Sequence, residues 1–318
     1  MTIPILISLI GFALAAYAVI ANDVIQTLGT FLTSNAKKHW LILWAFAAII
    51  LSSTLILGWA LNDGDVTYGR LSKIPLPETI EWWYLLPPLA LLIITQFGFP
   101  VSTTFMILSV FSTSQIIGKM VIKSVSGYAV AFLFAFIIYL IIARKFESKS
   151  SLDKTNLKDQ KRFWLVAQWF STGFLWSQWL IQDFANIYVY LPRQLDLYQL
   201  IGSLVFILVI LAFVFKRKGG KIQDVVTQKT NTANIRSATL IDLCYGIVLY
   251  VFTVINPIPM STTWTFVGIL AGREYAINYL MHKHLIKETY KKLFFDLYKV
   301  NIGLVVSIIL ALLIQQLK

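Results

Sequence analysis

Long apolar runs separated by short polar segments dominate the chain. An α-helix rises about 1.5 Å per residue, so a run of about twenty apolar residues crosses a hydrocarbon layer about 30 Å thick. The pattern therefore predicts several membrane-spanning helices. The predicted spans are Ile3–Ala21, Trp40–Leu61, Ser126–Ala143, Phe163–Ile181, Leu197–Phe215 and Ile302–Leu317.

Two further apolar runs, Glu81–Phe111 and Thr239–Leu270, are interrupted by proline. The interruptions are Gly98-Phe99-Pro100 and Asn256-Pro257-Ile258-Pro259. Proline removes a backbone donor and clashes with the preceding turn, so we expect each helix to break there. A break at membrane depth is tolerated where protein or a wet cavity surrounds it, and broken helices often mark a binding site.

Two short polar segments, Asn22–Thr30 and Gln182–Tyr188, follow two of the predicted spans. Each is too short to cross a membrane alone. We therefore expect each to form a re-entrant half-helix.

Two polar motifs occur twice at nearly one spacing. Pro100-Val101-Ser102-Thr103-Thr104 returns as Pro259-Met260-Ser261-Thr262-Thr263, a shift of 159 residues. Asn22-Asp23 returns as Gln182-Asp183, a shift of 160 residues. Plain helix capping by Ser and Thr is the alternative explanation of the Ser-Thr-Thr runs, but it does not explain the common offset. The chain is therefore predicted to consist of two repeats.

The fold class that follows is an all-α integral membrane protein with two inverted-topology repeats. We divide it into a first repeat at 1–147, a basic cytoplasmic linker at 148–159 and a second repeat at 160–318. If each broken helix returns to its starting side, each half has three crossings, and an odd number inverts the second half. With the linker inside, 21 of the 27 Lys and Arg residues lie inside and both termini lie outside.

Composition supports a membrane protein. Hydrophobic residues make up 58% of the 318 residues and charged residues 13%, against about 25% in soluble domains. The net charge of +12 belongs to short loops between apolar runs, which favours cytoplasmic loops of a plasma (inner) membrane protein over nucleic-acid binding. The single cysteine, Cys244, is expected to be a small buried hydrophobe.

The repeated motifs resemble those of the inorganic phosphate transporter (PiT) family. Ala21–Thr30 reads ANDVIQTLGT and is similar to that family's GANDVANAFGT signature, and PVSTT at Pro100–Thr104 is similar to its PVSTTH element. The resemblance implies a secondary active transporter of inorganic phosphate driven by Na⁺ or H⁺, with no enzyme activity and no other cofactor. Phe105 and Trp264 replace the histidine after each Ser-Thr-Thr. Sulfate permeases resemble the same family, so sulfate remains the alternative substrate.

A tetrahedral oxyanion in a water-poor site needs many donors. Each Ser-Thr-Thr run follows a proline, at the expected N-terminus of a half-helix, where free N–H groups and a positive dipole favour an anion. Two such ends facing each other would hold one anion near the membrane midplane. The predicted anion ligands are Ser102, Thr103, Thr104, Ser261, Thr262 and Thr263.

Asp23 and Asp183 are carboxylates within apolar surroundings, which usually line a pathway or hold a cation. The alternative is that each caps its half-helix at the interface, and we expect that capping role for Asp242. Oxygen ligands suit Na⁺, and a proton on either aspartate would serve instead. The predicted cation ligands are Asn22, Asp23, Gln26, Gln182, Asp183 and Asn186, with Na⁺ itself at Asn22, Asp23, Asp183 and Asn186.

The remaining features carry weaker expectations. The segment Glu274–Lys299 is expected to be an amphipathic helix on the cytoplasmic surface, and His282-Lys283-His284 lacks the further ligands of a metal site. Other function classes left open are a membrane enzyme acting on a phosphorylated lipid and a non-transporting phosphate sensor. The expected partners are phosphate or sulfate and membrane lipid, with a homodimer left open and no nucleic acid.

Overall fold

The computed structural model describes residues 2–96, 101–147, 157–217, 235–281 and 286–316, and these residues form helices joined by short loops. The helices of the first half are α1 (Ile3–Val19), a π-turn (Ile20–Val24), α2 (Ile25–Ser34), α3 (Trp40–Leu61), a 3₁₀ turn (Trp82–Leu85), α4 (Leu86–Gln96), α5 (Thr103–Phe111) and α6 (Ser114–Glu147). Those of the second half are α7 (Leu157–Asp183), α8 (Ala185–Tyr188), α9 (Leu197–Lys216), α11 (Ile235–Ile255), α12 (Thr262–Met281) and α13 (Ile286–Gln315).

Six helices in the described residues are long and apolar enough to span a membrane, and the protein is an integral membrane protein. Five of them overlap runs predicted above, and α3 has the predicted bounds. The sixth is α11, whereas α7 is long enough but too polar to qualify. Polar side chains of α7 such as Gln168 and Thr172 are buried in the protein, so low hydropathy here reflects an interior position.

The predicted surface helix at Glu274–Lys299 is wrong. Its first residues are the last turns of α12, which ends at Met281, and its later residues are the beginning of α13, which starts at Ile286. Lys287, Lys291 and Lys292 lie in the first part of α13, whose later part is apolar, whereas Lys283 lies outside the described residues. The amphipathic pattern therefore came from the ends of two membrane helices.

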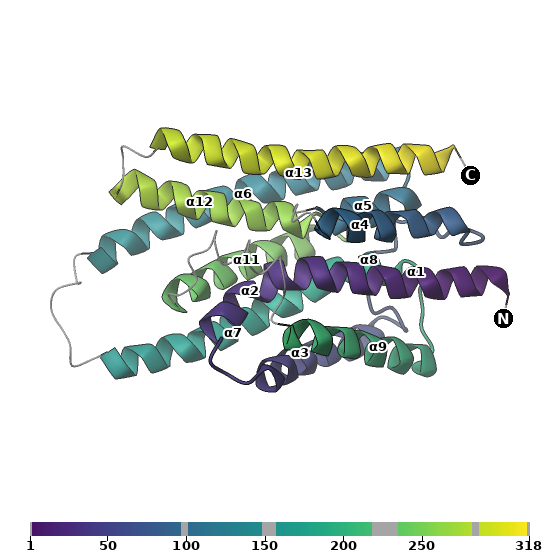
Figure 1. The fold of residues 1–318 in the computed structure, drawn as a ribbon, viewed down its shortest axis with the longest axis horizontal. Coiled ribbons are helices and arrows are strands. Elements are labelled where there is room, and N and C mark those ends of the chain that lie inside the picture. The colour runs from purple at the N-terminus through teal and green to yellow at the C-terminus, as the bar shows by residue number, and fades with distance from the viewer. Residues whose placement is uncertain (1, 97–100, 148–156, 218–234, 282–285, 317–318) are drawn as a thin grey trace.

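Equivalent helices of the two halves run in opposite directions (Figure 1). Both chain termini lie at one end of the molecule, and the ends of α6 and α7 that the linker joins lie at the other. The α4–α5 pair lies towards the end with the termini, whereas α11 and α12 lie towards the opposite end. This is the arrangement expected of inverted repeats.

Helices of one half pack against helices of the other half. In the first half α6 packs against α12, and in the second half α13 packs against α5. The contact between α6 and α12 is a close approach of backbones. A Cβ atom added to Gly268 would lie 2.6 Å from the carbonyl oxygen of Tyr128, and one added to Gly272 would lie 2.1 Å from that of Phe132. Small residues at membrane helix interfaces permit such approaches.

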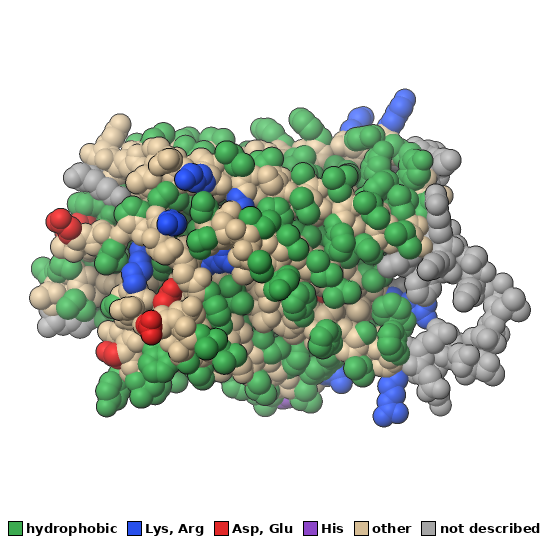
Figure 2. Space-filling model, turned by 180° about the vertical axis from the view of Figure 1, so that it is seen from behind, with side chains coloured by type: hydrophobic (Ala, Val, Ile, Leu, Met, Phe, Trp, Pro, Cys, Tyr) green, Lys and Arg blue, Asp and Glu red, His purple; other side chains and the backbone are tan. Residues whose placement is uncertain are grey.

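The surface matches a membrane environment. Hydrophobic side chains cover the middle of the face in Figure 2, and acidic side chains gather at the end that bears the termini, together with some Lys and Arg side chains. Further Lys and Arg side chains extend from the opposite end. Large apolar side chains such as Ile49, Phe170 and Val254 are more than 60% exposed. Lipid rather than water is the solvent in which such a surface is stable.

Candidate anion and cation site at the helix breaks

The two Ser-Thr-Thr motifs begin α5 and α12, and each serine caps its helix. The Ser102 hydroxyl accepts a hydrogen bond of 3.3 Å from Phe105 N, and Ser261 accepts one of 3.3 Å from Trp264 N. These pairs are separated by the predicted offset of 159 residues. Capping is thus one function of the motif, while Pro100 of the first motif lies outside the described residues.

Both predicted aspartates lie at irregularities in long helices. Asp23 belongs to the π-turn Ile20–Val24, which joins α1 to α2, and Asp183 is the last residue of α7, which one residue, Phe184, separates from the single turn α8. The expected half-helix at Asn22–Thr30 is therefore wrong, because α2 continues α1 through the π-turn. Such π-bulges are frequent at functional sites, since they redirect side chains without ending the helix.

Each carboxylate accepts a hydrogen bond from the first threonine of its own half. Thr103 Oγ1 donates to Asp23 Oδ2 over 2.5 Å, and Asn22 Nδ2 donates to Asp23 Oδ1 over 2.7 Å. Thr262 Oγ1 donates to Asp183 Oδ2 in the same way. The two halves therefore build equivalent carboxylate–threonine contacts.

The second threonine of each motif reaches across to the other half. Thr104 Oγ1 lies 3.2 Å from the carbonyl oxygen of Met260, and Thr263 Oγ1 lies 3.3 Å from that of Val101. These two bonds are also related by 159 residues. Thr104 lies 3.1 Å from Asp183 Oδ1 as well, so its hydroxyl connects the first motif to the second carboxylate. The structure thus brings the two motifs, far apart in sequence, into one cluster.

Asn186 of α8 lies at the centre of this cluster. Its Nδ2 atom lies 3.1 Å from Thr103 Oγ1, 3.3 Å from Thr104 Oγ1 and 3.3 Å from Asp183 Oδ1. The hydroxyl protons of both threonines point to oxygen acceptors, so the amide must turn its NH₂ group towards them. Asn186 Oδ1 is buried without a hydrogen-bond partner among the described residues. It is an oxygen atom that suits a cation.

All the predicted site residues whose side chains are described are at most 2% exposed. The side chain of Gln26 lies outside the described part of the chain. Gln182 does not join the Asp183 cluster through its amide nitrogen, because Nε2 donates to Thr253 Oγ1 over 2.7 Å. Phe105 and Trp264, which follow the two motifs, contact each other edge to face with ring centroids 6.5 Å apart.

Asp242 is not the interfacial cap that we expected. It lies within α11, is fully buried, and accepts hydrogen bonds from Thr30 Oγ1 at 2.6 Å and from Thr172 Oγ1 at 2.5 Å. These contacts join α2, α7 and α11. Sequence position suggested an interface because a basic loop precedes α11, but the helix extends further into that loop than its apolar run.

Sequence reasoning missed two buried basic residues, Arg70 and Lys123. Arg70 lies in the loop after α3 and Lys123 lies in α6, and both donate to the carbonyl oxygen of Asn256 at the second helix break. Lys123 lay just before a predicted span, where a lysine would ordinarily mark the membrane surface. The sequence offered one indication of their role: both belong to the six Lys and Arg residues that the predicted topology does not place in the cytoplasm.

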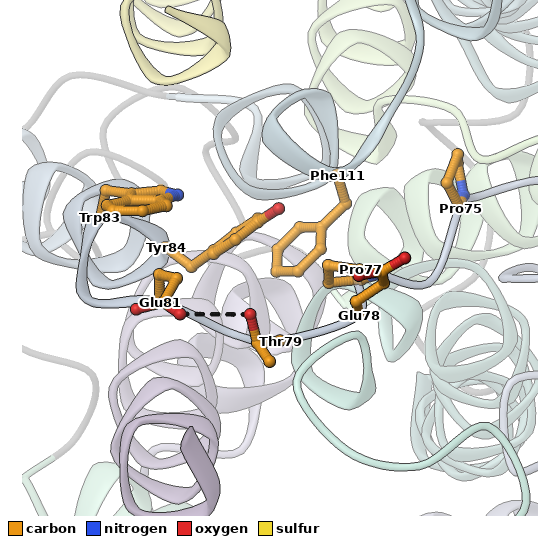
Figure 3. A pocket seen from close by; sticks show the side chains of 8 residues that line it. All are labelled: Pro75, Pro77, Glu78, Thr79, Glu81, Trp83, Tyr84 and Phe111. Atoms are coloured by element: carbon orange, nitrogen blue, oxygen red, sulfur yellow. Dashed lines mark hydrogen bonds between the residues drawn. The ribbon is translucent and has the colours of Figure 1, made fainter. Parts of the chain in front are cut away.

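A cavity of about 380 Å³ opens near the end of α5 that is remote from Thr103 (Figure 3). It is lined by Pro75, Pro77, Glu78, Thr79, Glu81, Trp83, Tyr84 and Phe111. Thr79 Oγ1 donates to Glu81 across 3.1 Å. Its charged lining is acidic, and Phe111 lies eight residues along α5 from Thr103, or about 12 Å. This cavity is therefore separate from the Ser-Thr-Thr cluster.

The described residues contain no group of three or more His, Cys, Asp or Glu side chains placed to hold a metal ion, and His282–His284 lie outside those residues. No protein-family model matches the chain, and no curated protein matches it. A solved structure titled "The sodium-dependent phosphate transporter" matches over 100% of both chains, with a TM-score of 0.62 and 17% sequence identity. The chain therefore has the same fold as that protein, and at this sequence identity the likeness shows the fold alone.

Proposed function

We propose that this protein is a secondary active transporter that moves inorganic phosphate across a membrane with a coupled cation. The observation that carries the proposal is the buried cluster in which Asp23 and Asp183 bind threonines from two Ser-Thr-Thr helix starts. Carboxylates and helix N-termini in one cluster provide for both a cation and an anion. The fold shared with a sodium-dependent phosphate transporter supports phosphate as the substrate.

The coupled cation would bind at Asn22, Asp23, Asp183 and Asn186. The orphan oxygen of Asn186 and the nearby carboxylate oxygens form a donor set suited to Na⁺, which prefers oxygen ligands. Asparagine ligates but does not titrate, which favours Na⁺ over H⁺ as the driving ion. The cation ligands thus come from both repeats.

The hydrogen bonds suggest how cation and anion binding are coupled. Thr103 and Thr262 direct their hydroxyl protons to the carboxylates, so neither is directed at an anion. A cation on the carboxylates would neutralise their charge and let the hydroxyls rotate towards an oxyanion. The N–H groups of the first turns of α5 and α12 would complete the anion site. Each ligand would therefore favour the other, which is what symport needs.

Electrical work explains why coupling is required. Moving an anion into a negative cell is opposed by about 2.3 kcal/mol per charge per 100 mV. A cation that crosses with the anion removes or reverses this opposition. We place both termini outside and the protein in the plasma (inner) membrane, because 21 of the 27 Lys and Arg residues then face the cytoplasm.

Uptake by proteoliposomes tests this function. Radiolabelled phosphate and sulfate are offered under an inward Na⁺ gradient, under a proton gradient and under neither. We expect phosphate to accumulate with the Na⁺ gradient. Uptake driven by a proton gradient alone would mean that a protonated aspartate, not bound Na⁺, couples transport. Accumulation of sulfate in place of phosphate would favour a sulfate permease. No accumulation of either anion would favour a non-transporting phosphate sensor.

A further inference from the structure

Two buried cations, Arg70 and Lys123, meet at the break between α11 and α12. Arg70 donates to the carbonyl oxygens of Asn256 at 2.8 Å and Thr253 at 3.0 Å. Lys123 donates to those of Asn256 at 3.0 Å and Ile258 at 2.6 Å. Arg70 is 2% exposed and Lys123 is 6% exposed. We call these two residues the cation pair.

With Lys123 protonated, the cation pair has an excess of positive charge. Because both side chains bind one carbonyl oxygen, their nitrogen atoms lie within about 6 Å of each other. The carbonyls at a helix C-terminus supply only a fraction of a negative charge. Burial lowers the pKa of Arg70 to about 10, against the opposing influence of Asp183, so Arg70 stays charged at neutral pH. A nearby anion would relieve the repulsion between the two cations.

The cation pair also has unused donors. Arg70 Nε is buried without a hydrogen-bond partner among the described residues. In its protonated form Lys123 carries three protons, of which two make hydrogen bonds. Buried donors of charged groups are strongly stabilised by a partner, so these N–H groups are candidates to contact a ligand.

An unused acceptor lies beside these donors. Gln182 Nε2 donates to Thr253 Oγ1, and that hydroxyl donates to Leu249 O over 2.7 Å. The threonine proton is therefore already committed, which fixes the glutamine with its NH₂ group towards Thr253. Gln182 Oε1 remains buried without a partner in the described part of the chain. Arg70 donates a hydrogen bond to the carbonyl oxygen of the same Thr253. Gln182 Oε1 and the cation pair are therefore neighbours.

We propose that Arg70, Lys123 and Gln182 form an oxyanion site at this break, which selects phosphate over sulfate. The cation pair would attract either anion. Near neutral pH phosphate carries a proton that Gln182 Oε1 can accept, whereas sulfate carries none and would leave that oxygen unpaired. A buried polar atom left unpaired by the wrong ligand is a strong source of discrimination. This inference rests on the proposed function and adds to the Ser-Thr-Thr anion site a neighbouring site at which phosphate is distinguished from sulfate.

The site adjoins the Ser-Thr-Thr cluster. Ser124, the neighbour of Lys123, accepts a hydrogen bond of 2.8 Å from Ser261 N, and Gln182 directly precedes Asp183. An anion that leaves the cation pair would therefore be next to the N-terminus of α12. The alternative is that both cations only satisfy the carbonyl oxygens that end α11, which would make their role purely structural.

Phosphate affinity of the purified full-length protein tests the proposal, measured by calorimetry with Na⁺ present, and sulfate affinity is measured alongside. Arg70→Gln and Lys123→Gln should each raise the phosphate Kd about tenfold or more, because each removes a charged donor. Arg70→Lys should recover most of the loss, since it keeps the charge. Gln182→Met should reduce the preference for phosphate over sulfate about tenfold, because it removes only the acceptor and the amide.

Arg193→Gln is the matched control. Arg193 makes the same kind of contact, with the carbonyl oxygens of Val189, Ile74 and Pro75, and its substitution changes the charge equally. We expect it to leave the phosphate Kd unchanged. Thermal melting shows which variants fold, and Lys123→Gln keeps the test decisive if Arg70→Gln does not fold.

The outcomes separate the two proposals. Folded Arg70→Gln and Lys123→Gln proteins that bind phosphate as tightly as the wild type would overturn the oxyanion site and leave the proposed function standing. An unchanged preference for phosphate in Gln182→Met would overturn the role of Gln182 in selection. A wild-type protein that binds neither anion would overturn the proposed function itself, and this site with it.

Discussion

Substituting Gly272 by alanine tests how tightly the packing of α6 and α12 positions the site. The added Cβ would lie 2.1 Å from the carbonyl oxygen of Phe132 and 2.9 Å from its carbonyl carbon, against 3.4–4 Å for ordinary contact. Both obstructing atoms are backbone, so no side chain can turn away. The helices must separate by about 1 Å to restore normal contact distances.

Overpacking of this kind costs about 1–3 kcal/mol, and the clash with backbone favours the upper end of that range. The better helix propensity of alanine offsets about 1 kcal/mol. We therefore expect Gly272→Ala to destabilise the protein by about 2 kcal/mol. Because α12 begins with Thr262, the separation should also weaken phosphate binding.

Unfolding in detergent micelles, followed by circular dichroism as temperature or SDS increases, measures this effect. Gly202→Ala is the control, because a Cβ on Gly202 in α9 meets nothing within 4 Å. It should be as stable as the wild type or more stable by up to about 1 kcal/mol. A Gly272→Ala protein that unfolds no earlier than Gly202→Ala would refute the close approach of α6 and α12.

Three further predictions concern the carboxylates and the topology. Asp23→Asn and Asp183→Asn should each abolish concentrative uptake in proteoliposomes while circular dichroism shows an intact fold; accumulation against a gradient by the double variant would exclude these residues as the coupling site. Asp242→Val should lower stability by about 1–3 kcal/mol in detergent melts, since two buried hydroxyls lose their acceptor, yet leave the Na⁺ dependence of uptake unchanged; an altered Na⁺ dependence would make Asp242 a coupling residue. Cysteines introduced at Ser151 and Asp65 should react with impermeant reagents from opposite sides of the membrane, and labelling from one side would contradict the inverted arrangement.

The sequence was sufficient to predict the parts of the fold that depend on local pattern. The α3 bounds follow directly from an apolar run, and the break between α11 and α12 follows from Pro257. The common offset of the Ser-Thr-Thr motifs predicted that α5 and α12 would be equivalent. The inverted repeat with its division at 1–147 and 160–318 stays a prediction, with which the opposite helix directions agree.

The parts that could not be predicted depend on tertiary contacts. Arg70 enters the site from a loop, and loop geometry leaves no periodic signal for it. Asp242 was expected at the membrane surface but is buried, because the hydroxyls of Thr30 and Thr172 donate to its carboxylate. Both threonines are distant from Asp242 in sequence, so no local pattern indicates these contacts. The π-turn around Asp23 was missed because a π-bulge inserts one residue into a helix without any breaking residue. The anion and cation assignments themselves stay predictions.

Calorimetric binding of phosphate to the purified protein, in Na⁺ and in an equal concentration of choline, tests the central claim most directly. The account predicts that phosphate binds in Na⁺, that its affinity falls in choline, and that Thr103→Val with Thr262→Val weakens binding in Na⁺, because both hydroxyls are donors to the anion once the cation occupies Asp23 and Asp183. Phosphate affinity that is equal in Na⁺ and choline and unaffected by the two substitutions would contradict it.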